Sequence, residues 1–185
     1  VIFTSKFQHI KRPEIFVRGV AQFLHSQEGK DWEVAFCAHI TDAGSKQRVV
    51  KQIPPALRSQ FRFITDLSGA DRDEYISTSV VVVSSACESF CLSAFEASLL
   101  GAVVVLNESN PSFGTDTLWH DGENCLKFDG TARGLAKALK RAASSDLKLE
   151  AVAQGAFKQP WLAASLPRDV RQSTDPVSKI SIVLY

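Results

Sequence analysis

Short apolar runs alternate along the chain with longer segments in which apolar residues recur at every third or fourth position. This alternation is typical of βαβ units and predicts a mostly parallel sheet of about six strands with helices on both faces. The run from Val80 to Val83 holds four β-branched residues, which suits a strand that is covered on both faces at the centre of the sheet. The expected fold class is therefore α/β, Rossmann-like and doubly wound.

The same pattern gives approximate bounds for the elements. Pro13 suits the first turn of a helix, Pro54 stops a second helix and Gly101 closes a third. The expected strands cover residues 1–4, 33–40, 61–64, 80–83, 102–106 and 125–128. The expected helices cover residues 13–26, 46–53, 70–77, 92–100 and 147–157, with another that follows its N-cap, Thr131.

Composition restricts the class of protein. With 185 residues, 45% apolar content and a formal net charge of +1, the chain suits one globular domain rather than a disordered segment. A nucleic-acid binder would show a basic excess, so we expect no nucleic-acid partner. The longest apolar stretch, Leu99 to Leu106, is far shorter than the ~20 residues that span a bilayer.

The cysteines bear on the cellular compartment, and the chain ends bear on domain organisation. No C-x-x-C pair occurs, so we expect a protein of a reducing, cytoplasmic compartment. We expect each cysteine to be buried as a small hydrophobic residue, at Cys37, Cys87, Cys91 and Cys125. The chain opens with Val1 and contains no methionine, so we expect a piece of a longer protein. Periodicity is lost near residue 160, which divides the chain into a domain over 1–160 and a C-terminal segment and linker over 161–185.

Two acidic residues stand where a parallel sheet places its ligands. Loops at the carboxyl ends of the strands surround such sites, and Glu88 lies in the loop after the Val80 to Val83 strand. Glu96 lies on the following helix with leucines three and four positions away, and a carboxylate on an apolar surface needs a partner. A sugar diol is one candidate partner. Solvent or a lysine is the alternative.

Positive charge is expected at the same edge of the sheet. The amides from Phe90 to Ser93 would be unpaired first-turn N–H groups, which bind anions at helix N-termini. Lys6 and Lys11 follow the first strand and reach this edge if the first and fourth strands are neighbours. The alternative is that both lysines are solvated surface residues.

The spacing of these residues resembles a known family. Glu88-x7-Glu96, between a β-branched strand and the segment from Glu96 to Val104, resembles the E-x7-E region of the retaining, nucleotide-sugar-dependent glycosyltransferases of family 4. Residues 4–13 (TSKFQHIKRP) are similar to the family's G-R-L…K-G loop, and residues 121–125 (DGENC) to its D-G-x-N-G turn. The resemblance covers residues 1–160 and implies the C-terminal, donor-binding domain of a GT-B enzyme.

The resemblance implies a role for each matched residue. Glu96 would hold the nucleotide ribose, Lys6 and Lys11 the diphosphate, and Glu88 the donor sugar. The amides at the start of the helix would assist with the donor, from Ser89, Phe90, Cys91 and Leu92. The donor would be a UDP-, GDP- or ADP-sugar, with no divalent metal and no other cofactor.

The implied reaction needs partners beyond this chain. An acceptor-binding domain would precede Val1 in the same polypeptide, so the piece alone would be inactive. The acceptor would be a glycan or a lipid-linked sugar, and a lipid carrier would place the whole protein at the inner face of the membrane. A GT-B nucleotide-sugar epimerase remains an alternative within enzymes.

The chain departs from the family pattern at several positions. Lys6 replaces an arginine, Arg12 replaces a glycine, and Cys91 stands where the E-x-F-G-L stretch has its glycine. A side chain at position 91 requires either a negative backbone φ or altered donor binding. These departures leave open a non-catalytic module that keeps the fold and has lost donor binding.

Overall fold

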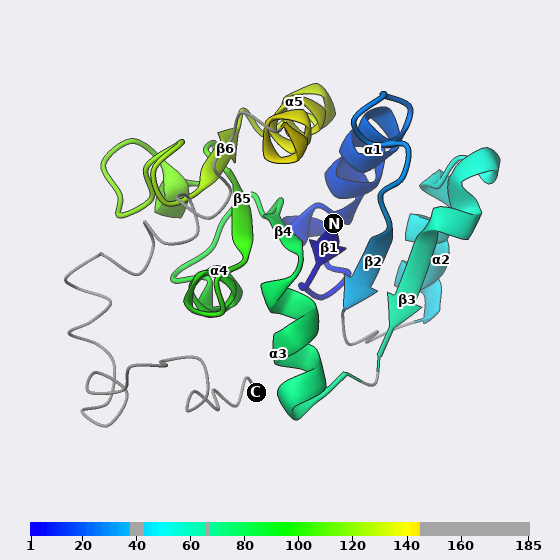
Figure 1. Cartoon of the computed structure of the whole chain (residues 1–185), viewed down its shortest axis with the longest axis horizontal. Coiled ribbons are helices and arrows are strands. Elements are labelled where there is room, and N and C mark those ends of the chain that lie inside the picture. Colours follow the sequence, from blue (N-terminus) through cyan, green and yellow to red (C-terminus); the bar gives the residue numbers. More distant parts are fainter. Residues whose placement is uncertain (38–42, 66, 145–185) are drawn as a thin grey trace.

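A six-stranded, wholly parallel sheet forms the centre of the computed structural model, which describes residues 1–37, 43–65 and 67–144 (Figure 1). The strand order is β3-β2-β1-β4-β5-β6, which confirms the expected doubly wound, Rossmann-like α/β fold. The strands are β1 (Ile2–Phe3), β2 (Val34–Cys37), β3 (Phe61–Ile64), β4 (Val80–Val83), β5 (Val103–Asn107) and β6 (Leu126–Phe128).

The described part of the chain also holds five α-helices and three short 3₁₀ segments. The α-helices are α1 (Pro13–Leu24), α2 (Ala43–Gln52), α3 (Gly69–Ser77), α4 (Leu92–Leu99) and α5 (Ala132–Ala143). The 3₁₀ segments are η1 (His9–Lys11), η2 (Pro55–Gln60) and η3 (Pro111–Phe113). The expected helix over 147–157, the domain boundary near 160 and the segment 161–185 lie outside the described residues.

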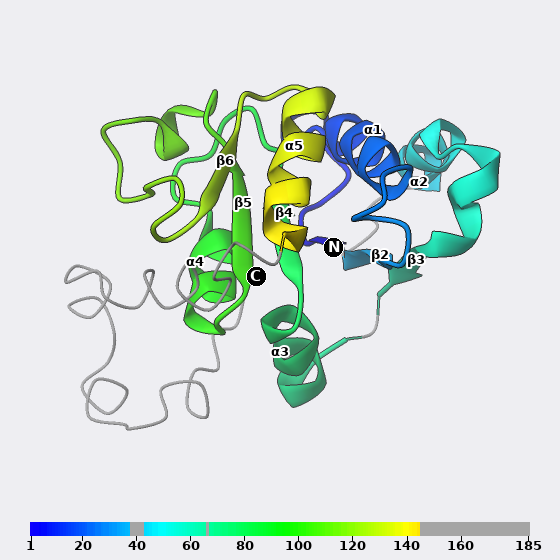
Figure 2. The same cartoon turned by 45° about the horizontal axis from the view of Figure 1, so that its top comes forward.

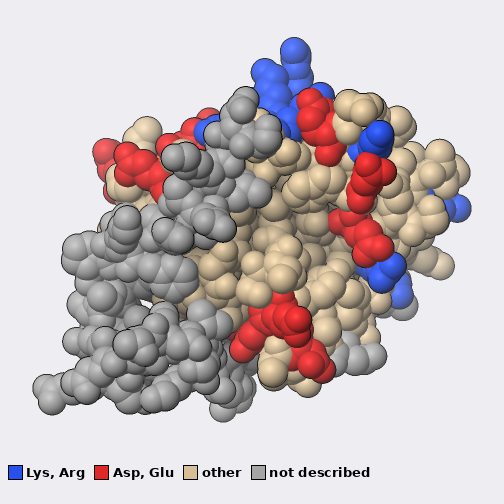
Figure 3. All heavy atoms as spheres, viewed as in Figure 1, with Lys and Arg blue, Asp and Glu red and all other residues tan. Residues whose placement is uncertain are grey.

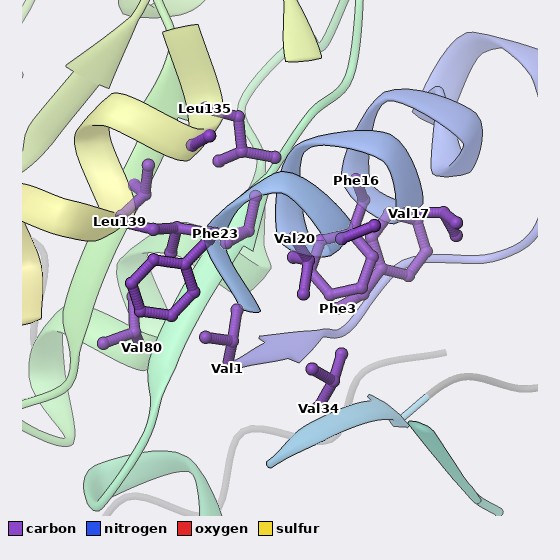
Figure 4. Close-up of a cluster of buried hydrophobic side chains, with 14 of the residues drawn as sticks. Val1, Phe3, Phe16, Val17, Val20, Phe23, Val34, Val80, Leu135 and Leu139 are labelled. Atoms are coloured by element: carbon purple, nitrogen blue, oxygen red, sulfur yellow. The ribbon is translucent and has the colours of Figure 1, made fainter. Parts of the chain in front are cut away.

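The helices cover both faces of the sheet. Helices α1 and α5 lie side by side over one face, and α3 and α4 lie on the other (Figures 1 and 2). Two separate hydrophobic clusters fill the layers, one beneath α1 and α5 and one beneath α3 and α4. Figure 4 shows Phe23 on α1 between Leu135 and Leu139 of α5 and Val80 of the sheet.

Local sequence signals account for the two helices of the first layer. Pro13 occupies the first turn of α1, where its missing N–H has no cost. The Thr131 hydroxyl caps α5 by accepting from the Gly134 amide at 2.9 Å, as its position in the sequence predicted. Gly19 permits close packing of the pair, because a Cβ there would meet the Leu135 side chain at 2.7 Å.

The cysteine prediction is partly wrong. Cys91 and Cys125 are buried, but Cys37 is half-buried and Cys87 is exposed. Cys87 lies in the loop after β4, which borders the carboxyl edge of the sheet rather than its core, so solvent reaches it. No helix in the described residues is long and apolar enough to cross a membrane.

Candidate functional site

The centre of the sheet places one loop from each half of the fold beside the other. β1 and β4 are neighbours, and the chain continues from β1 toward β2 on one side and from β4 toward β5 on the other. The carboxyl ends of such a strand pair form the crevice in which open α/β sheets bind ligands. Lys11 lies in η1 after β1, and Glu88 lies in the loop after β4.

The two predicted residues at this crevice meet directly. The Lys11 ammonium donates to both carboxylate oxygens of Glu88, at 2.6 Å and 2.7 Å. Their side chains are 22% and 11% exposed, so the pair is largely shielded but open to solvent on one side. The Ser85 hydroxyl adds a third hydrogen bond to Glu88, at 2.6 Å. A lysine and a carboxylate therefore neutralise each other at the mouth of the crevice.

Hydrogen bonds to the backbone fix the relative position of the two loops. The Ser84 hydroxyl lies within bonding distance of two carbonyl oxygens in the β1 loop, those of Lys11 at 2.8 Å and Arg12 at 3.1 Å. The Ala86 amide donates to the Ile10 carbonyl at 2.8 Å. The position of Lys11 opposite Glu88 is thus set by the backbone as well as by the ion pair.

The end of β5 and the loop that follows it support the site through two asparagines, a role that sequence reasoning missed. The Asn107 amide nitrogen donates to the Ser85 carbonyl at 3.0 Å, and Asn110 donates to the same carbonyl at 3.3 Å. Both asparagines are fully buried. A polar residue directly after four apolar strand positions was the available signal, since a buried amide must find partners.

The N-terminus of α4 opens into the same region. The Ala94 amide bonds to the Cys91 carbonyl, but within the described residues no hydrogen bond leaves the amides of Leu92 or Ser93. Unpaired first-turn amides and the positive end of the helix favour an anion. Phe90 and Leu92 beside them are half exposed, and the ring of Phe90 stacks on that of Phe95, with 4.5 Å between the ring centroids.

Cys91 accommodates its side chain in an unexpected way. Its backbone φ is +54°, in the left-handed region that favours glycine, and not the negative value that we gave as one possibility. The side chain packs into the cluster beneath α3 and α4 and is only 8% exposed. Burial raises the pKa of the Cys91 thiol. Cys91 therefore has a side chain on a backbone conformation that glycine adopts more easily.

This geometry predicts an inverted ranking of alanine and glycine at position 91. An L-residue at this φ costs about 1 kcal/mol relative to glycine, so Cys91→Gly should have a free energy of unfolding about 1 kcal/mol above that of Cys91→Ala. Gln22, exposed on α1, is the matched control, because there glycine should be about 1 kcal/mol worse than alanine. Urea unfolding of the four variants measures both differences, and the same sign at the two positions would contradict the prediction.

Glu96 has found a partner that neither alternative named. Glu96 on α4 is 5% exposed, and the guanidinium of Arg72 on α3 donates two parallel hydrogen bonds to its carboxylate, at 2.7 Å and 2.6 Å. Arg72 also reaches Asp73 at 3.3 Å. The hydrogen bonds to Glu96 raise the pKa of Arg72. The expectation that Glu96 meets solvent or a lysine is wrong, because an arginine on the neighbouring helix has two N–H groups that match both carboxylate oxygens.

The structure places the remaining predicted residues apart from these contacts. Lys6 follows β1 and is exposed, and its side chain forms no hydrogen bond or ion pair with any described residue. Ser89 is exposed in the loop after β4. Lys11 and Glu88 are thus brought together, while Glu96 is held separately by Arg72. No cluster of ligands suited to a metal ion occurs in the described part of the chain.

The fold defines a class of domain. No family model matches the sequence, and a search of curated proteins found no match. Comparison with solved structures shows that the fold is that of the C-terminal domain of GT-B glycosyltransferases. The C-terminal domain of the group 1 glycosyltransferase LpcC from Francisella tularensis has a TM-score of 0.66 and 20% sequence identity, covering 88% of this chain and 83% of that domain.

Two longer proteins share the same fold over part of their length. HepE from Anabaena, solved with UDP and glucose, has a TM-score of 0.68 and 20% identity over 84% of this chain. The UDP-forming trehalose-phosphate synthase of Burkholderia vietnamiensis has a TM-score of 0.65 and 13% identity over 84% of this chain. This chain spans 42% of the first protein and 40% of the second, less than half of each.

Proposed function

We propose that this chain is the donor-binding domain of a retaining glycosyltransferase of family 4. It would bind a UDP-, GDP- or ADP-sugar, whose sugar passes to a glycan or lipid-linked acceptor. The observation that carries the proposal is the Lys11–Glu88 pair, which stands at the junction of β1 and β4 beside the unpaired amides of α4. The fold shared with HepE, which was solved with UDP and glucose, supports it.

The charged groups suit a diphosphate. Lys11 would exchange Glu88 for a phosphate oxygen, and the amides of Leu92 and Ser93 would bind the same anion. Lys6, which is exposed in the same loop as Lys11, adds a second cation within that loop. Donors fixed in advance where negative charge develops stabilise a leaving diphosphate without a metal ion. Glu88, once released by Lys11, would accept hydrogen bonds from hydroxyls of the donor sugar.

The transfer itself exchanges one bond at the anomeric carbon for another. The bond from that carbon to the phosphate oxygen breaks, and its electron pair stays on the nucleoside diphosphate. The acceptor oxygen then bonds to the same face of the carbon, which retains the configuration, and the acceptor proton passes to the departing phosphate. The acceptor would lie in another domain of the same polypeptide, in keeping with the part of HepE that this chain spans.

Titration calorimetry with UDP, GDP and ADP tests the proposal. Lys11→Met keeps most of the apolar stem and removes the charge, so nucleotide affinity should fall about 10- to 100-fold. Lys140→Met is the matched control, because Lys140 also pairs with a glutamate, Glu28 at 3.5 Å, but lies in the last turn of α5. The control should bind as the wild type does. Equal affinity in the wild type and Lys11→Met would overturn the proposal.

A further inference from the structure

The ion pair between Arg72 and Glu96 covers the carboxylate that, by the family resemblance, would hold the nucleotide ribose. Nη1 of Arg72 donates to Oε1 of Glu96, and Nη2 donates to Oε2. The Glu96 side chain is 6% exposed, whereas that of Arg72 is 27% exposed. Arg72 is therefore the outer member of the pair, and a ligand that approaches Glu96 from solvent meets the guanidinium first.

A ribose and an arginine make the same demand on a carboxylate. The guanidinium presents two parallel N–H donors to the two oxygens, and a vicinal diol presents two O–H donors to the same pair. Because each partner occupies both oxygens, Glu96 holds one or the other. Binding of the diol requires that Arg72 move away.

Arg72 has another acceptor close at hand. One of its terminal nitrogens already lies 3.3 Å from a carboxylate oxygen of Asp73. Helix α3 also carries Asp71 and Glu74, and Figure 3 shows acidic side chains gathered over this helix. A guanidinium that leaves Glu96 thus stays in a negative environment, which lowers the cost of its release.

We propose that Arg72 is a removable cap on Glu96, and that competition between its guanidinium and the ribose hydroxyls sets how strongly the domain favours a ribonucleotide. The inference rests on the proposed function, since it requires that a nucleoside diphosphate bind with its ribose toward α4. Arg72 acts here as a specificity-determining residue. The cap makes the ribose contribute less to affinity than an open carboxylate would allow.

The test compares a ribonucleotide with its 2′-deoxy form. Calorimetry uses UDP, GDP or ADP, whichever binds best, and the matching 2′-deoxynucleoside diphosphate, which lacks half of the diol. In Arg72→Gln the ribonucleotide should bind about tenfold more tightly, while the deoxynucleotide changes little. The ratio of the two affinities should therefore rise about tenfold. Glu96→Gln should bring that ratio close to one.

Two further variants make the result decisive. Arg62→Gln removes an exposed arginine on β3 that bonds to Glu33 at 2.8 Å. This variant should leave the ratio of the two affinities unchanged. Arg72→Lys keeps a charge but cannot bond to both oxygens in parallel, so its ratio should lie between those of the wild type and Arg72→Gln. Thermal unfolding checks that each variant is folded. If Arg72→Gln does not fold, the affinity ratio of Arg72→Lys decides the test.

The outcomes separate the cap from the proposed function. A ratio that stays constant or falls in the folded Arg72 variants overturns the cap, while Lys11-dependent binding by the wild type leaves the proposed function intact. Binding by Arg72→Gln where the wild type shows none supports both. No binding of any of the three nucleotides by any folded variant overturns both.

Discussion

Replacement of Phe36 by alanine is expected to lower the free energy of unfolding by about 3–5 kcal/mol. Phe36 on β2 is 1% exposed, so its removal leaves a cavity that its neighbours fill only in part. The centroid of its ring lies 4.9–6.2 Å from those of five other rings, so the cluster connects β2 to β1, β3 and α1. These partners are Phe3, Phe7, Phe16, Phe61 and Phe63. Urea unfolding followed by circular dichroism measures the loss.

Phe90 provides the matched control, because the same atoms are removed from a side chain that is 53% exposed. Among the described residues its ring contacts one other, that of Phe95, so we expect a loss of about 1 kcal/mol in Phe90→Ala. Similar losses for the two variants would show that the ring cluster does not hold β1, β2 and β3 together as described.

Replacement of Asn107 by aspartate is expected to lower the free energy of unfolding by about 3 kcal/mol at neutral pH. The side chain keeps its shape, but the amide donor that bonds to the Ser85 carbonyl becomes an oxygen, so two acceptors face each other in a buried site. The loop after β4 loses this support, and nucleotide binding should weaken with it. Unfolding and calorimetry measure the two effects.

The stability of Asn107→Asp should also depend on pH, which gives a second test of this prediction. Burial raises the pKa of the new carboxyl group above the value of about 3.9 that it has in the unfolded chain. The folded state then holds the proton more tightly, so stability relative to the wild type falls as the pH rises through the interval between the two pKa values. Glu108→Gln, at the exposed next position, is the control. A pH-independent difference would contradict this account.

The sequence predicted the sheet well because local signals determine it. The strands over 61–64 and 80–83 have the predicted bounds, and those predicted over 1–4, 102–106 and 125–128 differ by one residue at one or both ends. Residues 38–40 of the strand predicted over 33–40 lie outside the described residues. Apolar runs mark buried parallel strands directly, and parallel strands that alternate with helices leave few possible topologies. Lys11 and Glu88 lie at the same edge, as expected if the first and fourth strands are neighbours, but their direct contact was not predicted.

The residues that sequence reasoning missed depend on packing between helices. Arg72 lies in a polar stretch, Ala70 to Glu74, that has the pattern of a solvated helix surface. Its bond to Glu96 requires that α3 and α4 lie on the same face of the sheet. The sequence of neither helix indicates how the two pack against each other. The sequence analysis left the backbone conformation of Cys91 open, because the left-handed φ goes against the residue's own preference and depends on its surroundings.

One of the links between the loops after β1 and β4 is a backbone bond from the amide of Ala86 to the carbonyl of Ile10. Neither side chain takes part, so any residue can replace Ile10, and any residue except proline can replace Ala86, without loss of this bond. Side chains along the crevice can therefore diverge while the spacing of the two loops is kept. A backbone bond of this kind allows evolution to change ligand preference one side chain at a time while this contact between the loops is kept.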